Sequence, residues 1–239
     1  MEQIHIETNN RLYSFYRSVY PPVESNMYVF VENDECIIID TNISNEVLQV
    51  LDERGVRKVH LLLTHEHYDH SHGISWLKEH FDVTLYCHTK CSEGLSTKKR
   101  STPRLVALVI AAKNKESGED NYAKFKDEYT DYCHQADVAF DDEMTASLGN
   151  HTIHCIHAPG HSPGSAIYVM DENLVFTGDS MIQSNKVITS FRGGSKDEFF
   201  EITLPLLQSF HDDMIIMPGH GEWFKKKQFN FNIYNVWST

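Results

Sequence analysis

One short stretch of the chain concentrates the side chains that proteins use to bind metal ions. Residues Thr64–His70 contain His65, His67 and His70 together with Asp69. Imidazole nitrogens and carboxylate oxygens are donors for zinc, iron and manganese. A run of exposed histidines is the alternative interpretation, because the chain has 15 histidines in all. The density of donors in this stretch favours a metal site.

Three more donors stand alone, far apart in the sequence, and each directly follows a glycine. They are His161 after Gly160, Asp179 after Gly178 and His220 after Gly219. A glycine lets the backbone approach another segment closely. One dense cluster and three single donors are difficult to explain by structural roles alone. The chemistry that such a set offers is the activation of water by bound metal ions.

Short apolar segments precede these donors and predict the strands that position them. Each segment ends next to the polar residue in question, as buried strands do. The expected strands before the donors are Val59–Leu63, Thr152–His157, Leu174–Thr177 and Met214–Met217. A further buried strand, Cys36–Ile39, ends in the carboxylate of Asp40. Of the three histidines on the 152–157 strand and its flank, His157 is expected near the site, and His151 and His154 are expected to be exposed.

Amphipathic spacing predicts helices between these strands. The expected helices are Asn42–Glu53, with Ser44 as its N-cap, Ile74–His80 and Lys196–Phe210. Strands and helices alternate through the first part of the chain, which indicates a layered α/β fold.

Residues 90–136 differ from the rest and are predicted to be a helical insertion between two strands. The aromatic residues Tyr122, Phe125, Tyr129 and Tyr132 recur at helical spacing. Packing of this stripe against the core is the favoured interpretation, and contact with a ligand is the alternative. Either way, the insertion is expected beside the active-site edge, where it could select the substrate.

Composition restricts the partners of the protein. The 239 residues carry a formal net charge of −13, which argues against a nucleic-acid backbone as partner. No stretch resembles a signal peptide, and no apolar run is long enough to span a membrane. The five cysteines are odd in number and form no C-x-x-C motif, which favours a reduced, cytoplasmic compartment. We expect one domain over residues 1–239.

Four sequence blocks resemble those of the metallo-β-lactamase superfamily, and within it the glyoxalase-II-like hydrolases. The blocks are Thr64–His70 (T-H-x-H-x-D-H), Pro159–Ser165 (P-G-H-S-P-G-S), Phe176–Asp179 (F-T-G-D) and Pro218–Gly221 (P-G-H-G). They occur in the family's order and cover most of the chain. The resemblance implies a four-layer αβ/βα sandwich, in which two mixed β-sheets are flanked by helices and the metals lie at one edge.

The resemblance also implies a ligand set for two divalent metal ions. One metal would take His65, His67 and His161, the other would take Asp69, His70 and His220, and Asp179 would bridge them. Zinc is the expected metal, with iron or manganese as alternatives. Asp40 would orient a ligand histidine by accepting its other N–H, or would cap a buried turn. Asp69 would also act in catalysis by receiving a proton during turnover.

The implied function is hydrolysis of a small molecule, with a metal-bridging hydroxide attacking an acyl carbonyl, as in a thioester. A lactonase or a small-molecule phosphodiesterase could use the same centre, although the lactonases typically have a tyrosine where this chain has Ile182. A common dizinc β-lactamase would have a cysteine in place of Asp179. The alternative from another functional class is a protein that senses metals or ligands and has no catalytic activity. No residue is assigned to substrate binding, and the chain could form a homodimer.

Overall fold

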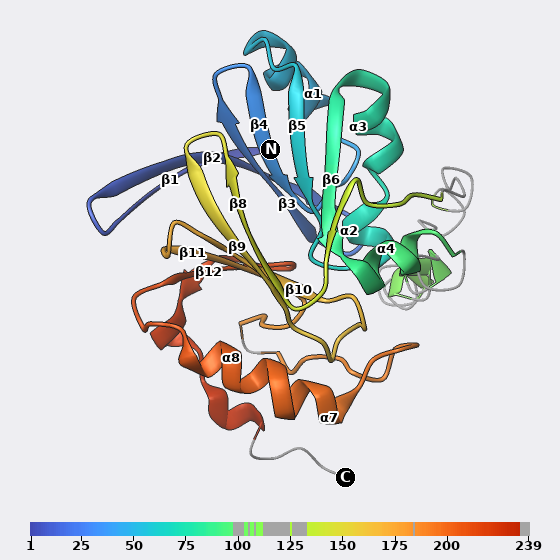
Figure 1. Cartoon of the computed structure of the whole chain (residues 1–239), viewed down its shortest axis with the longest axis vertical. Coiled ribbons are helices and arrows are strands. Elements are labelled where there is room, and N and C mark those ends of the chain that lie inside the picture. The colour runs from blue at the N-terminus through green and yellow to red at the C-terminus, as the bar shows by residue number, and fades with distance from the viewer. Residues whose placement is uncertain are drawn as a thin grey trace.

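Two β-sheets pack face to face, and helices cover the outer face of each sheet (Figure 1). The structure is a computed structural model, and it describes residues 1–97, 103–104, 106–107, 109–111, 125, 133–183 and 185–234. This arrangement confirms the predicted four-layer sandwich of two mixed sheets with flanking helices.

The first sheet has seven strands that pair in the order in which they occur in the chain. The first four strands pair with one another in antiparallel fashion, and the pairs from β4 to β7 are parallel. The strands are β1 (Glu2–Thr8), β2 (Arg11–Tyr20), β3 (Ser25–Glu32), β4 (Glu35–Ile39), β5 (Lys58–Leu62), β6 (Asp82–His88) and β7 (Val138–Phe140).

The second sheet has six strands, and only β11 and β12 pair in parallel. Parallel neighbours need a crossover connection, and the helical segment before β12 supplies it. The strands are β8 (Glu143–Leu148), β9 (His151–His157), β10 (Ala166–Met170), β11 (Leu174–Gly178), β12 (Ile215–Pro218) and β13 (Phe224–Lys225).

The helices lie close to their predicted positions. They are α1 (Asn45–Glu53), α2 (Tyr68–Ser71), α3 (Ile74–His80), α4 (Thr89–Leu95), α7 (Lys196–Glu198), a π-helical turn (Phe199–Thr203), α8 (Leu204–Ser209) and two 3₁₀ turns (Lys226–Gln228 and Phe231–Tyr234). Ser44 caps α1 as predicted, because its hydroxyl accepts the Val47 N–H at 3.3 Å. The single helix predicted over 196–210 contains a π turn before Pro205, which has no N–H to donate to the preceding turn.

Three clusters of buried apolar side chains hold the layers together. One fills the space between the sheets and includes Phe15, Phe30, Tyr168 and Phe176. A second packs α1, α3 and α4 on the first sheet, and a third packs α8 and the chain around Phe229 on the second sheet. Among the described residues, no helix is long and apolar enough to cross a membrane.

The insertion is described only in part. Thr89–Leu95 is helical, and the described residues Val106, Ile110 and Phe125 form a buried cluster with Tyr68. The Phe125 ring lies 5.8 Å from that of Tyr68, which agrees with a packing role for this aromatic position. Tyr122, Tyr129 and Tyr132, which belong to the same predicted stripe, lie outside the described residues.

One prediction for the histidines of β9 is wrong. His154 is exposed, but His151 is only 6 % exposed. The His151 ring lies between two carboxylates, that of Asp171 in the turn after β10 and that of Glu32 on β3 of the other sheet. Hydrogen bonds to both ring nitrogens compensate its burial.

The cysteines behave as small apolar residues. Cys36, Cys87, Cys91 and Cys155 are buried free thiols, and Cys133 is exposed. Burial raises the pKa of Cys155 to about 12 and also raises the pKa of Cys36 and Cys91. Thiols that stay protonated are poor nucleophiles and poor metal ligands.

Candidate metal centre

The predicted donors meet where strands of both sheets end. The strands β5, β11 and β12 end at Leu62, Gly178 and Pro218, directly before the segments that carry His65, Asp179 and His220. The loop between β9 and β10 adds His161. The edge where the two sheets meet is therefore the place at which distant parts of the sequence converge.

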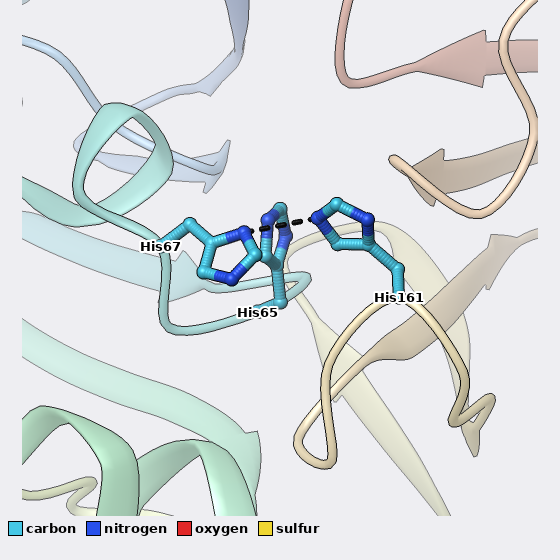
Figure 2. A group of neighbouring side chains, drawn as sticks. All are labelled: His65, His67 and His161. Atoms are coloured by element: carbon cyan, nitrogen blue, oxygen red, sulfur yellow. Dashed lines mark hydrogen bonds between the residues drawn. The ribbon is translucent and has the colours of Figure 1, made fainter. Parts of the chain in front are cut away.

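The first group of donors contains His65, His67 and His161. Figure 2 shows their rings, which point toward one another from two separate loops. His161 Nε2 lies 2.9 Å from His67 Nδ1. His65 Nε2 is buried and has no hydrogen-bond partner among the described residues. Three buried ring nitrogens that converge on one point are the arrangement expected of a metal-binding triad.

The second group contains Asp69, His70 and His220. His70 Nε2 lies 3.3 Å from His220 Nε2 and 3.4 Å from Asp69 Oδ2. The same carboxylate oxygen lies 3.3 Å from His220 Nε2. This group has the same members as the second set implied by the sequence resemblance.

Asp179 lies between the two groups. Its Oδ1 atom is 3.4 Å from His70 Nε2 and 3.5 Å from His220 Nε2, and its Oδ2 atom is 3.5 Å from His161 Nε2. Oδ1 is also buried without a hydrogen-bond partner in the described part of the chain. One carboxylate oxygen thus faces each group, which is the position a bridging ligand requires.

The charge states of the histidines suit cation binding. Burial lowers the pKa of His67 to about 3 and lowers the pKa of His65 and His161 as well. Burial would also lower the pKa of His220, but the carboxylates of Asp179 and Asp69 raise it to about 10. Neutral imidazole is the form that binds metals, and cations could take the place of the protons that balance the carboxylates. The residues present therefore fit two divalent ions.

Asp40 orients one histidine of each group. The backbone N–H of Thr64 donates to Asp40 Oδ1 at 2.7 Å, and the Thr64 hydroxyl donates to Oδ2 at 2.7 Å. His70 Nδ1 donates to Oδ2 at 2.9 Å. Because the Thr64 hydroxyl points its hydrogen at Asp40, its oxygen accepts from His65 Nδ1 at 3.0 Å. His65 and His70 therefore both present Nε2 to the centre.

Backbone carbonyls orient two further histidines. His161 Nδ1 donates to the carbonyl of Ile188 at 2.9 Å, and His220 Nδ1 donates to that of Val23 at 3.0 Å. Both rings then turn Nε2 toward the centre. Sequence analysis missed these contacts, because any residue type can supply a carbonyl.

Glu66 is a second residue that sequence analysis missed. It lies between two donor histidines, is 1 % exposed, and accepts a hydrogen bond from the Ser162 hydroxyl at 2.9 Å. Ser162 follows His161, so this contact joins the two loops that supply the first group. The proximity of Glu66 to the donors was visible in the sequence, but its partner was not.

Close packing explains one of the glycines next to a donor. A Cβ atom on Gly219 would lie 2.4 Å from Asp179 Oδ1 and 2.8 Å from His70 Cε1. Only glycine leaves room for the 218–221 segment to approach both side chains.

A pocket of about 400 Å³ opens onto the centre. His67, Asp69, His161, Asp179 and His220 form its floor. Its walls carry Tyr68, Asn185 and Lys186 and six apolar side chains, those of Val23, Val106, Val109, Ile182, Ile188 and Phe191. The volume is within the range of small-molecule sites, so a small molecule could reach the donors. His72 faces elsewhere: its Nδ1 contacts the Tyr68 carbonyl at 3.0 Å and its ring stacks on Tyr68.

Replacing Asp40 with asparagine should weaken metal binding and turnover by roughly 10–100-fold. Asp40 has a φ of 56°, which asparagine also tolerates, so the backbone should stay in place. An amide has one acceptor oxygen for the three donors, and its NH₂ group would face at least one of them. Metal titration of the purified variant and its rate constants would measure the loss.

Asp171 offers a matched control for this variant. It too has a positive φ, of 52°, and accepts from a backbone N–H, that of Thr152, and contacts a histidine Nδ1, that of His151. The substitution Asp171→Asn should lower the melting temperature without weakening metal binding. Equal metal affinity in the two variants would contradict the role given to Asp40.

Comparison with known proteins places the chain among metal-dependent hydrolases. The family model described as "Metallo-beta-lactamase superfamily" matches residues 20–220. The probable metallo-hydrolase YqgX of Bacillus subtilis is 26% identical over 202 residues, which are 83% of this chain and 82% of that protein. The hydroxyacylglutathione hydrolase GloC of Haemophilus influenzae is 24% identical over 199 residues, 80% of this chain and 82% of that protein.

Two further comparisons agree with this placement. The probable polyketide biosynthesis zinc-dependent hydrolase PksB of Bacillus subtilis is 24% identical over 177 residues, which are 74% of this chain and 63% of that protein. The crystal structure of the BLEG-1 B3 metallo-beta-lactamase superposes with a TM-score of 0.69 and 26% identity, and the match covers 90% of this chain and 95% of that one.

Proposed function

The chain belongs to the metallo-beta-lactamase superfamily, and from this premise we propose that it is a dinuclear metal-dependent hydrolase of small thioesters. The observation that carries the dinuclear part is the position of Asp179, which has one oxygen near each donor group. His65, His67 and His161 would hold one ion, and Asp69, His70 and His220 would hold the other. Zinc is the proposed metal, since a relative that covers most of this chain is named as zinc-dependent.

The reaction that suits this centre is attack of water on an acyl carbonyl. When bound, two divalent ions would polarise the carbonyl and lower the pKa of a water molecule. Asp69 lines the pocket as well as the centre. We propose that its carboxylate takes up the proton of the attacking water and passes it to the leaving group. Asp40 and the carbonyls of Ile188 and Val23 keep the histidines in the orientation that this chemistry requires.

Support for a thioester comes from the sequence blocks and from one relative. The four blocks resemble those of glyoxalase-II-like enzymes, and GloC is named as a hydroxyacylglutathione hydrolase. A lactone or a phosphodiester could be cleaved by the same donor set. Ile182 lines the pocket where a lactonase would typically have a tyrosine, so a thioester is favoured over a lactone.

A substrate panel tests the proposal. The purified protein, loaded with zinc, should hydrolyse a simple acyl thioester at least tenfold faster, in kcat/KM, than a lactone, a bis-aryl phosphodiester or a β-lactam. Faster cleavage of the lactone or the phosphodiester would move the function to that class. Two bound metals with no turnover of any of the four compounds would contradict a general hydrolase and favour a sensor.

A further inference from the structure

We infer that the pocket selects thioesters that carry an apolar group beside the scissile bond, and that the insertion supplies part of the surface that recognises it. The inference rests on the proposed function, because it concerns the substrate of the same centre. It adds a substrate class and the residues that determine specificity.

The first support is the chemistry of the pocket wall. Beyond the donors on its floor, the pocket is lined mainly by aliphatic and aromatic side chains. Among the residues that the structure describes, the carboxylates that line it are those of Asp69 and Asp179, which belong to the centre. In a chain with a net charge of −13, the described part of this wall is notably apolar, with six aliphatic or aromatic side chains beside the donors. Such a wall would bind an apolar group by removing it from water.

The second support is the exposure of two of these side chains. Val109 is 41 % exposed and Ile188 is 49 % exposed, and both line the pocket. Val109 comes from the insertion and Ile188 from the segment between β11 and α7, so two distant parts of the chain leave apolar surface open at one place. Apolar surface that gathers at a cleft marks a binding site, whereas single exposed apolar residues need no explanation.

The third support is the continuity of the apolar wall with the donors. The Phe191 ring lies 5.6 Å from that of His67 and 5.7 Å from that of His161, in edge-on geometry. On another side, Val106 packs against Tyr68, which lies between two donors in the sequence. An apolar group held by this wall would therefore lie directly beside the bond that the centre attacks.

Two polar residues complete the lining and limit the class further. Asn185 and Lys186 are exposed residues of the same wall. A substrate that carries a polar group as well as the apolar one matches a wall with both kinds of side chain. Experiment can show whether the apolar group lies on the acyl side or on the thiol side of the thioester.

Two series of thioesters test the inference. In one, the acyl chain is lengthened from acetyl to octanoyl on a fixed small polar thiol. In the other, the thiol carries an alkyl chain of increasing length and the acyl group stays acetyl. We expect kcat/KM to rise by roughly fourfold for each methylene that the pocket buries, in one of the two series. The series that shows the rise identifies the side on which the apolar group lies.

Variants at the wall test which residues are responsible. Ile188→Asp and Val109→Asp should each remove most of the rise with chain length. Matched controls are Ile43→Asp, at an isoleucine that is 58 % exposed in a similar irregular segment, and Ile202→Asp, at a helical isoleucine that is 46 % exposed. Neither control residue lines the pocket, so both controls should keep the dependence on chain length.

The outcomes separate this inference from the proposed function. No hydrolysis of any thioester would contradict the proposed function itself. Hydrolysis without a rise in either series would leave the proposed function standing and overturn the inference. A rise that survives in the Ile188 and Val109 variants as it does in the controls would also overturn it, because another surface would then bind the apolar group.

Discussion

Replacing Asp179 with alanine is expected to lower kcat roughly 10³-fold and to reduce the number of bound metal ions. Asp179 has one oxygen facing each donor group, so its loss removes a ligand from both proposed metals at once. Metal ions would stabilise the transition state by several kcal/mol, and this stabilisation is then lost. Each 1.4 kcal/mol corresponds to a factor of ten in rate. Elemental analysis of the purified variant and its steady-state kinetics would measure both effects.

Asp179→Asn provides a graded comparison. The amide keeps one oxygen donor but removes the negative charge, so we expect metal content and rate between those of the wild type and the alanine variant. Circular dichroism would establish that both variants fold. Full activity with two bound metals in Asp179→Ala would contradict the dinuclear proposal.

Removal of divalent ions is expected to abolish hydrolysis and to lower the melting temperature. The ring nitrogens and carboxylates of the centre are buried together, and the buried Nε2 of His65 and Oδ1 of Asp179 have no hydrogen-bond partner among the described residues. Bound ions would satisfy these atoms and would stabilise the folded state by about 4 kcal/mol at a thousandfold excess over Kd. Calorimetry before and after dialysis against a chelator would measure the shift.

Restoration with single metals identifies the ion and its stoichiometry. Zinc should restore activity when two equivalents per chain have been added, and iron and manganese are the comparisons. A matched experiment on Asp40→Asn should need a higher concentration of metal for the same activity. A chelated protein that keeps its full rate would exclude metal-assisted hydrolysis.

The proposed metal donors could be identified from the sequence because their residue types are rare and several of them lie close together in the chain. His65, His67, Asp69 and His70 lie within a few positions, so their proximity needs no knowledge of the fold. His161, Asp179 and His220 could be added because each follows a predicted strand and a glycine. The structure places all seven at one edge. Two groups of neighbouring donors have the members that the resemblance implies, and a third group joins His65 and His70 to Asp179.

Other features could not be predicted, because they depend on contacts between distant segments. The side chain of His151 was expected at the surface, since nothing near it in the sequence indicates that Asp171 and Glu32 enclose it. The contact of Glu66 with Ser162 joins residues 96 positions apart. The carbonyls of Ile188 and Val23 carry no signal of residue type at all.

The sequence by itself was enough to predict the donor set, the proposed class of metal chemistry and the alternation of strands and helices. These follow from residue type and from local periodicity, which the chain carries in any conformation. Only the tertiary structure decided the distances between the donors and Asp179, which partner orients each histidine, and that Val109 of the insertion and Ile188 line one pocket. Those relations require that the two sheets pack with their strand ends at a common edge, and that packing is a property of the whole chain.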